Sequence, residues 1–181
     1  MRRIAVLSGL VLVGGVLGPS TAFAGEESHS GDQTRWIAVE DNSAVVLPDG
    51  QTFTGDTGQM DQNGSPDVGT RLFISEVLYA TSDGSTRGDK VGRSHIECTA
   101  QVVENNFLCL AALVFGDSQL TVSVDLDFSD PSAEGQPFDI AVTGGTNDFF
   151  GATGQVTATD ISKSTKETVT LYEADLVLPH K

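Results

Sequence analysis

Hydrophobic and polar residues alternate in short runs along this 181-residue chain, and helical periodicity is hard to find after residue 34. The runs are rich in β-branched and aromatic residues, and Gly, Asp, Asn and Ser separate them. The alternation is clearest over 119–128, where the apolar face consists of Leu120, Val122, Val124, Leu126 and Phe128. If the first two runs form one bent strand, the pattern predicts eight strands from the runs 35–40, 43–47, 71–80, 93–103, 107–116, 118–128, 136–143, 152–161 and 167–178.

Residues 108–115 differ from the other runs because they are apolar on both faces. Such a strand has to be covered twice, once by the interior of the fold and once by a neighbouring subunit or a long loop. We therefore expect a homodimer or a homotrimer. Turn signals about every 10–15 residues indicate an all-β sandwich or an antiparallel β-barrel, and the pattern alone does not separate the two.

The first 24 residues have the pattern of a signal peptide. Two arginines precede an apolar run at 4–17, and 22–24 read Ala-Phe-Ala, which is a cleavage-site pattern. The apolar run is shorter than the roughly 20 residues of a membrane-spanning helix, so an uncleaved anchor is the weaker alternative. We predict a secreted protein with a signal peptide at 1–24, a polar flexible lead-in at 25–34 and a single domain at 35–181.

The chain is strongly acidic, with 25 Asp and Glu against 10 Lys and Arg and a formal net charge of −15 at pH 7. Such a surface repels nucleic acid and anionic lipid. We therefore expect neither nucleic acid nor a membrane as a partner of the mature chain.

The longest departure from the strand pattern is the connection 47–70, which is rich in Gly and Asp. A connection of this length is usually a functional lid or a poorly ordered segment, and we expect a loop over one mouth of the fold. Calcium binding is a weaker interpretation, because neither this segment nor 125–134 has the ligand spacing of an EF-hand loop. We predict no metal site and no cofactor.

Cys98 and Cys109 are the only cysteines, and both follow the predicted signal peptide. An even count in an oxidising compartment favours a disulfide across the predicted hairpin. A two-residue turn at Asn105 and Asn106 would place Leu113 opposite Cys98, so the bond requires a shifted turn or a bulge. We predict the bond, with a stabilisation of about 2–3 kcal/mol because the loop it closes is short.

Residues 137–161 combine two strand-like runs with a Gly-rich connection that contains Phe149 and Phe150. We interpret the connection as a packed structural corner rather than a ligand site. Its sequence, AVTGGTNDFFGATGQV, resembles the GGSG-or-GGTG, F-x-G, x-x-G-Q-V segment of the allene oxide cyclase barrel, a fold shared with plant dirigent proteins. Dirigent proteins usually have Asp and Arg where this chain has Asn147 and Thr153, so the segment is closer to the cyclases. The resemblance implies an all-β, about eight-stranded antiparallel barrel.

Residues 39–42 resemble the Y-E-x-N segment of the plant cyclases, whose Glu and Asn help to hold a water and polarise the substrate. The resemblance implies Glu40 and Asn42 as catalytic residues, with Glu76 and Tyr79 on the neighbouring strand. The chain departs from the pattern at Glu76, where bacterial secreted relatives of this barrel usually have Asn. A buried Glu has a raised pKa and can donate a proton. The alternative is that both glutamates face solvent on an acidic surface.

No hydrolytic motif accompanies the three histidines, and a single strand histidine such as His95 is more commonly structural. Three classes of function stay open. The first is an isomerase of the cyclase type that acts on an apolar small molecule, the second a non-catalytic barrel that holds or orients such a ligand, and the third a structural module with a filled interior. An open apolar cavity would favour the first two, and a buried carboxyl group with a shifted pKa would favour chemistry.

Overall fold

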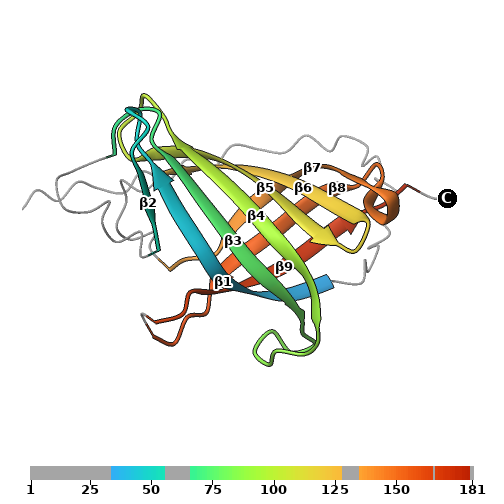
Figure 1. Cartoon of the computed structure of the whole chain (residues 1–181). Coiled ribbons are helices and arrows are strands. Elements are labelled where there is room, and N and C mark those ends of the chain that lie inside the picture. The colour runs from blue at the N-terminus through green and yellow to red at the C-terminus, as the bar shows by residue number, and fades with distance from the viewer. Residues whose placement is uncertain (1–33, 56–65, 128–134, 165, 180–181) are drawn as a thin grey trace, which may run out of the picture.

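The computed structural model describes residues 34–55, 66–127, 135–164 and 166–179, and these residues form one antiparallel β-barrel (Figure 1). The predicted signal peptide, the lead-in as far as residue 33 and the centre of the connection 47–70 lie outside the described residues. No helix in the described part of the chain is long and apolar enough to cross a membrane.

The barrel consists of eight strands in sequence order, closed by pairing of the first strand with the last. A ninth, short strand, β2, pairs with the last three residues of β1, Ala44 to Val46, and was not predicted from the sequence. The strands are β1 (Thr34–Val46), β2 (Thr52–Thr54), β3 (Arg71–Ala80), β4 (Lys90–Ala100), β5 (Asn106–Phe115), β6 (Ser118–Asp127), β7 (Phe138–Thr146), β8 (Thr153–Asp160) and β9 (Val169–Val177). The predicted barrel is therefore confirmed.

The first two predicted runs form one strand, β1, as expected for a bent strand. The bend is a β-bulge, because Glu40 pairs with Glu76 whereas Asn42 pairs with Ser75, which leaves Asp41 as the extra residue. Beyond the bulge the side chains of β1 exchange faces. This one irregularity decides which side chains of the 39–42 segment reach the interior.

Side chains alternate between the barrel interior and its outer face, as the period of two requires. At one end the interior is filled by a cluster that includes Trp36, Leu78, Leu113 and Leu120, with Phe115 packed against it. The ring centroids of Trp36 and Phe115 lie 4.9 Å apart. We call this the packed end. The opposite end, where β1 reaches Glu40 and β6 reaches Leu126, is called the cavity end.

The Gly-rich corner lies at the packed end and contains a short 3₁₀ turn, Asn147–Phe149. A Cβ atom on Gly145 would lie 2.7 Å from the Gln119 carbonyl oxygen and 2.5 Å from Cβ of Phe149, so no larger residue fits there. Phe149 packs against the core cluster, and its ring centroid is 5.5 Å from that of Phe115. Phe150, by contrast, is 74% exposed. The corner is packed as predicted, through one of its two phenylalanines.

The disulfide Cys98–Cys109 is present, as predicted. The two cysteines are direct cross-strand partners on β4 and β5. The turn lies earlier in the chain than a two-residue turn at Asn105 and Asn106 would, because the Gln101 amide already donates to the Asn106 carbonyl at 2.8 Å. Asn105 adopts a left-handed backbone with φ of 60°, which Asn tolerates. This is the shifted turn that the bond required.

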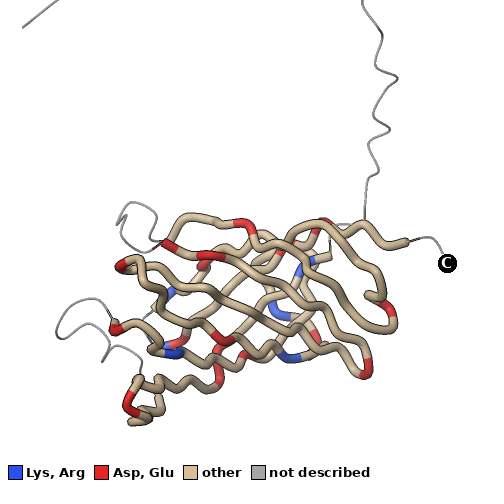
Figure 2. Tube along the Cα trace, turned by 90° about the horizontal axis from the view of Figure 1, so that it is seen from above, with Lys and Arg blue, Asp and Glu red and all other residues tan. Residues whose placement is uncertain are grey.

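Acidic residues occur along the whole barrel, with few basic residues among them (Figure 2). On the outer face of β5, Leu108 and Leu110 are 44% and 56% exposed, so the strand that reads as apolar on both faces is covered only from within by the described residues. The expected dimer or trimer stays a prediction.

Candidate ligand-binding site

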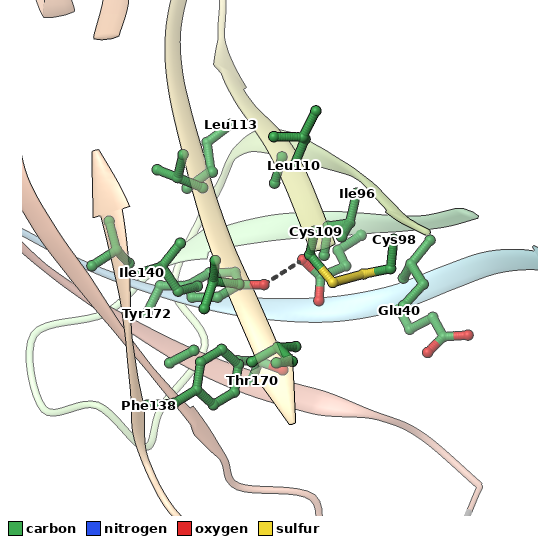
Figure 3. A pocket seen from close by; sticks show the side chains of 18 of the residues that line it. Glu40, Ile96, Cys98, Cys109, Leu110, Leu113, Phe138, Ile140, Thr170 and Tyr172 are labelled. Atoms are coloured by element: carbon green, nitrogen blue, oxygen red, sulfur yellow. Dashed lines mark hydrogen bonds between the residues drawn. A yellow bond between two sulfur atoms is a disulfide. The ribbon is translucent and has the colours of Figure 1, made fainter. Parts of the chain in front are cut away.

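The barrel interior contains a cavity of about 230 Å³ at its cavity end (Figure 3). Its floor is formed by residues near the middle of the strands, including Leu113 and Glu76, and its rim includes Phe138 and Asp160 at strand ends. Every barrel strand contributes at least one lining residue. The cavity is therefore a property of the closed barrel and not of one loop.

The side of the cavity formed by β4, β5, β6 and β7 is apolar, and we call it the apolar wall. The side chains that form it are Ile96, Cys98, Cys109, Ala111, Leu113, Val122, Val124, Leu126, Phe138 and Ile140. The disulfide is part of this wall, where its sulfur atoms replace larger side chains (Figure 3). Most of the contact area offered to a ligand is thus hydrocarbon and sulfur.

The other side carries all the polar side chains among the described lining residues, and we call it the acidic wall. It consists of Glu76 on β3, Glu40 on β1, Thr168, Thr170 and Tyr172 on or beside β9, and Asp160 on β8. These strands are neighbours in the sheet. Glu40 is the direct partner of Glu76, its amide donates to the Thr168 carbonyl at 3.1 Å, and Asp160 is the partner of Thr170.

Glu76 is the most deeply buried acidic residue of this wall, with 4% of its surface exposed. Its Oε2 atom accepts hydrogen bonds from the Ser94 hydroxyl and, at 3.0 Å, from the Tyr172 hydroxyl. Burial raises the pKa of the Glu76 carboxyl; the two hydrogen bonds oppose that shift, and the nearby Glu40 and Asp41 add to it. Because Oε2 accepts both bonds, a proton held by the group belongs on Oε1.

Tyr172 stays neutral, so its hydroxyl can donate the hydrogen bond to Glu76. Burial raises the pKa of its phenol well above the usual value, and the adjacent Glu76 raises it further. A phenol with a raised pKa keeps its proton and continues to donate to Glu76 at neutral and mildly alkaline pH. Ser94 is fully buried beside them. The three side chains form an enclosed polar group in an otherwise apolar floor.

Two of the four residues that the family resemblance implied lie at this cavity, Glu40 and Glu76. Asn42 does not, because the bulge at Asp41 turns it to the exposed outer face opposite Ser75. Tyr79 also lies on the outer face, where it packs against a second apolar cluster, with the Arg87 guanidinium 6.0 Å from its ring centroid. The expectation that all four share the interior is corrected by the strand register.

Tyr172, Ser94 and Asp160 were not identified from the sequence, although Tyr172 and Asp160 belong to the acidic wall and Ser94 and Tyr172 donate to Glu76. The alternation within 167–178 places Tyr172 on one face with Ala174, which is the available signal. Choosing that face as the interior required the closing pair of β1 and β9. In the described part of the chain, no group of three or more His, Cys, Asp or Glu is arranged to hold a metal ion.

No family model matches the sequence. No curated protein matches it at a significant level.

Solved structures do match the fold. A pyocyanin demethylase is 19% identical, covers 80% of this chain and 99% of its own, and has a TM-score of 0.54. Two pterocarpan synthase dirigent proteins are 18% and 17% identical, with TM-scores of 0.53; they cover 80% and 79% of this chain, and 86% and 93% of their own. At these identities the similarity concerns the fold alone. The chain has the closed β-barrel fold that dirigent proteins share, as the resemblance of its Gly-rich corner implied.

Proposed function

We propose that the protein binds an apolar small molecule inside its barrel, at the cavity end. The observation that carries the proposal is the cavity inside the barrel, whose apolar wall faces a few convergent polar groups. A structural module with a filled interior would have packed this space, as the packed end does. The fold neighbours carry names that refer to chemistry on small molecules, which agrees with this use of the barrel.

The cavity volume limits the part of the ligand that can be enclosed. A cavity of about 150 Å³ accepts benzene, so one of about 230 Å³ encloses roughly ten non-hydrogen atoms. This corresponds to one or two fused rings, or to a short branched chain. A longer ligand would extend past Phe138 and Asp160 at the rim.

Binding is tested with a neutral bicyclic probe, 2-naphthol, by calorimetry or probe fluorescence. Val124→Trp fills the cavity from β6 and should abolish binding, whereas Ser123→Trp adds the same side chain to the outer face of that strand and should leave binding unchanged. Equal binding by both variants, or no binding by the unmodified protein, would contradict the proposal.

Catalysis of an isomerase or cyclase type is the finer proposal, with Glu76 as the acid. It is supported by the raised pKa of Glu76 and its hydrogen bonds from Ser94 and Tyr172, an arrangement that keeps a carboxylic acid able to donate a proton. Glu40, the direct cross-strand partner of Glu76, is less buried and would assist charge development beside it. With a substrate in hand, Glu76→Gln should retain binding and slow turnover on the order of 10²-fold. Unchanged turnover would leave the dirigent-like binding barrel as the function.

We also propose that the protein acts after export, as a secreted protein. The disulfide and the signal-peptide pattern of the first 24 residues support this. Mass spectrometry of protein from its own host should find a mature chain that starts near Gly25 and has lost two hydrogens at its cysteines. An intact, reduced chain in the cytosol would contradict it.

A further inference from the structure

We infer that the cavity selects its ligand by charge: it takes an apolar body that carries one basic, cationic nitrogen and rejects carboxylates of the same shape. The inference rests on the proposed function, since it names the ligand class of the same cavity. It follows from where charged side chains lie in and around the barrel.

The first observation concerns the lining itself. Among the described residues that line the cavity, three are acidic, Glu40, Glu76 and Asp160, and none is Lys, Arg or His. An anionic head placed in this cavity would lose its hydration without gaining a cationic partner. It would also approach the acidic side chains of Glu40 and Asp160. A fatty acid or aryl carboxylate is therefore disfavoured, because no cationic side chain lines the cavity and two acidic ones, Glu40 and Asp160, do.

The second observation concerns the arginines of the barrel, which are engaged elsewhere. Arg35, Arg71, Arg87 and Arg93 each form a salt bridge with an acidic side chain: Glu173, Glu97, Glu167 and Asp41 respectively. None of these eight side chains lines the cavity. The lysines nearest in sequence to the rim, Lys163 and Lys166, are exposed in the connection between β8 and β9 and are also absent from the lining.

The third observation is the arrangement of the acidic groups. They lie on β3, β1 and β8, which together with β9 form one wall, and the apolar wall faces them across the cavity. In Figure 3, the Tyr172 hydroxyl points to the buried carboxyl group. A flat ring body can lie against the apolar wall while a charged nitrogen at its edge meets the acidic wall. A hydrogen-bond donor on that nitrogen would find carboxyl and threonine oxygens as acceptors.

The overall charge of the protein acts in the same direction. A formal net charge of −15 lowers the local concentration of anions and raises that of cations, most strongly at low ionic strength. A concave site with apolar walls focuses this field. Asp160 and Thr168 are exposed at the rim, so solvent screens part of the effect there.

The test uses three probes with one naphthalene body: 2-naphthylmethylammonium, 2-naphthylmethanol and 2-naphthoate. We expect the cation to bind at least about tenfold more tightly than the carboxylate at low salt, with the neutral alcohol between them. If the carboxylate binds as tightly as the cation, the inference of charge selection is wrong, but the proposed binding of apolar molecules in the barrel is still supported. If neither the alcohol nor the charged probes bind, the proposed function itself fails.

Variants then locate the effect. Asp160→Asn and Glu40→Gln should each reduce the preference for the cation over the alcohol by about threefold or more, with little change in the affinity for the alcohol. Asp175→Asn removes the same charge from the exposed outer face of β9 and serves as the control. If Asp175→Asn lowers the preference as much as the two wall variants do, the selection comes from net charge alone and the assignment to the acidic wall is overturned.

Discussion

The two ends of the barrel are built from the same strands and the same alternation, yet one is packed and the other is hollow. At the packed end large side chains such as Trp36, Leu78 and Leu120 meet across the axis. At the cavity end the interior positions include small or polar residues such as Ala111 and Thr170 beside larger apolar ones such as Ile96 and Leu126. The period of two fixes which side chains face inward, and their size and polarity fix whether space is left between them. The packed core and the cavity are therefore separated along the barrel axis.

The largest expected effect compares two leucines on the inner face of β6. Leu120 is fully buried in the packed end and does not line the cavity, whereas Leu126 does line it. Leu120→Ala should lower the free energy of unfolding by about 2–5 kcal/mol, because it opens a new cavity. Leu126→Ala enlarges an existing space and should cost about 1–2 kcal/mol, mainly the transfer of the lost carbons. Chemical denaturation of both variants measures the difference; equal losses would mean that the two ends are not packed differently.

The disulfide is expected to have the next largest effect, and it belongs to the cavity end. Cys98 and Cys109 are separated by 11 residues, a short loop. Replacing both with Ala should lower the free energy of unfolding by about 2–3 kcal/mol. Binding of a neutral naphthalene probe should weaken as well, because the bond is part of the apolar wall. Unfolding measured with and without reductant on the unmodified protein provides the control. A loss well under about 1 kcal/mol would show that the register alone holds β4 and β5 together.

Glu76, at the floor of the cavity, is expected to make a smaller contribution to the free energy of unfolding, and this contribution depends on pH. Its pKa in the folded barrel is raised by burial above the ordinary value of 4.5, so the folded state holds this proton when the unfolded chain has lost it. Its contribution to stability is therefore fully present below about pH 4.5 and is lost as pH rises through the folded pKa. Each unit of pKa difference is worth about 1.4 kcal/mol.

Glu76→Gln removes this titration while leaving an amide oxygen to accept from Ser94 and Tyr172. Urea unfolding of both proteins between pH 4 and pH 8 should show the variant gaining stability relative to the unmodified protein as pH rises. The remaining carboxyl groups titrate in both proteins, so they largely cancel in the difference. Parallel stability profiles would mean that Glu76 is ionised in the folded state without cost.

The sequence predicted the fold better than the site, because the site depends on one bulged residue and on contacts between strands. Alternation predicted the strands, the family resemblance of the Gly-rich corner implied the barrel, and the cysteines predicted their bond. The placement of Asn42 depended on a single bulged residue, Asp41, which no composition signal marks. Ser94 is the direct partner of Glu76 in the β3–β4 pair. Tyr172 lies 96 residues from Glu76, and only the closing pair of β1 and β9 brings it to the same carboxyl group.

The smallest expected effect tests the register shift of β1 at Asp41 directly. Asn42→Ala and Tyr79→Phe change two residues that the family resemblance implied as catalytic but that face away from the cavity. Because neither lines the cavity, both variants should bind the naphthalene probes with dissociation constants within about twofold of the unmodified protein. Glu40→Gln, one residue before the bulge and inside the barrel, should alter the preference for the cation in the same assay. A loss of binding in Asn42→Ala comparable to that in Glu40→Gln would mean that β1 has no bulge at Asp41 in solution, and that residues 39–42 present their side chains to the ligand as the resemblance implied.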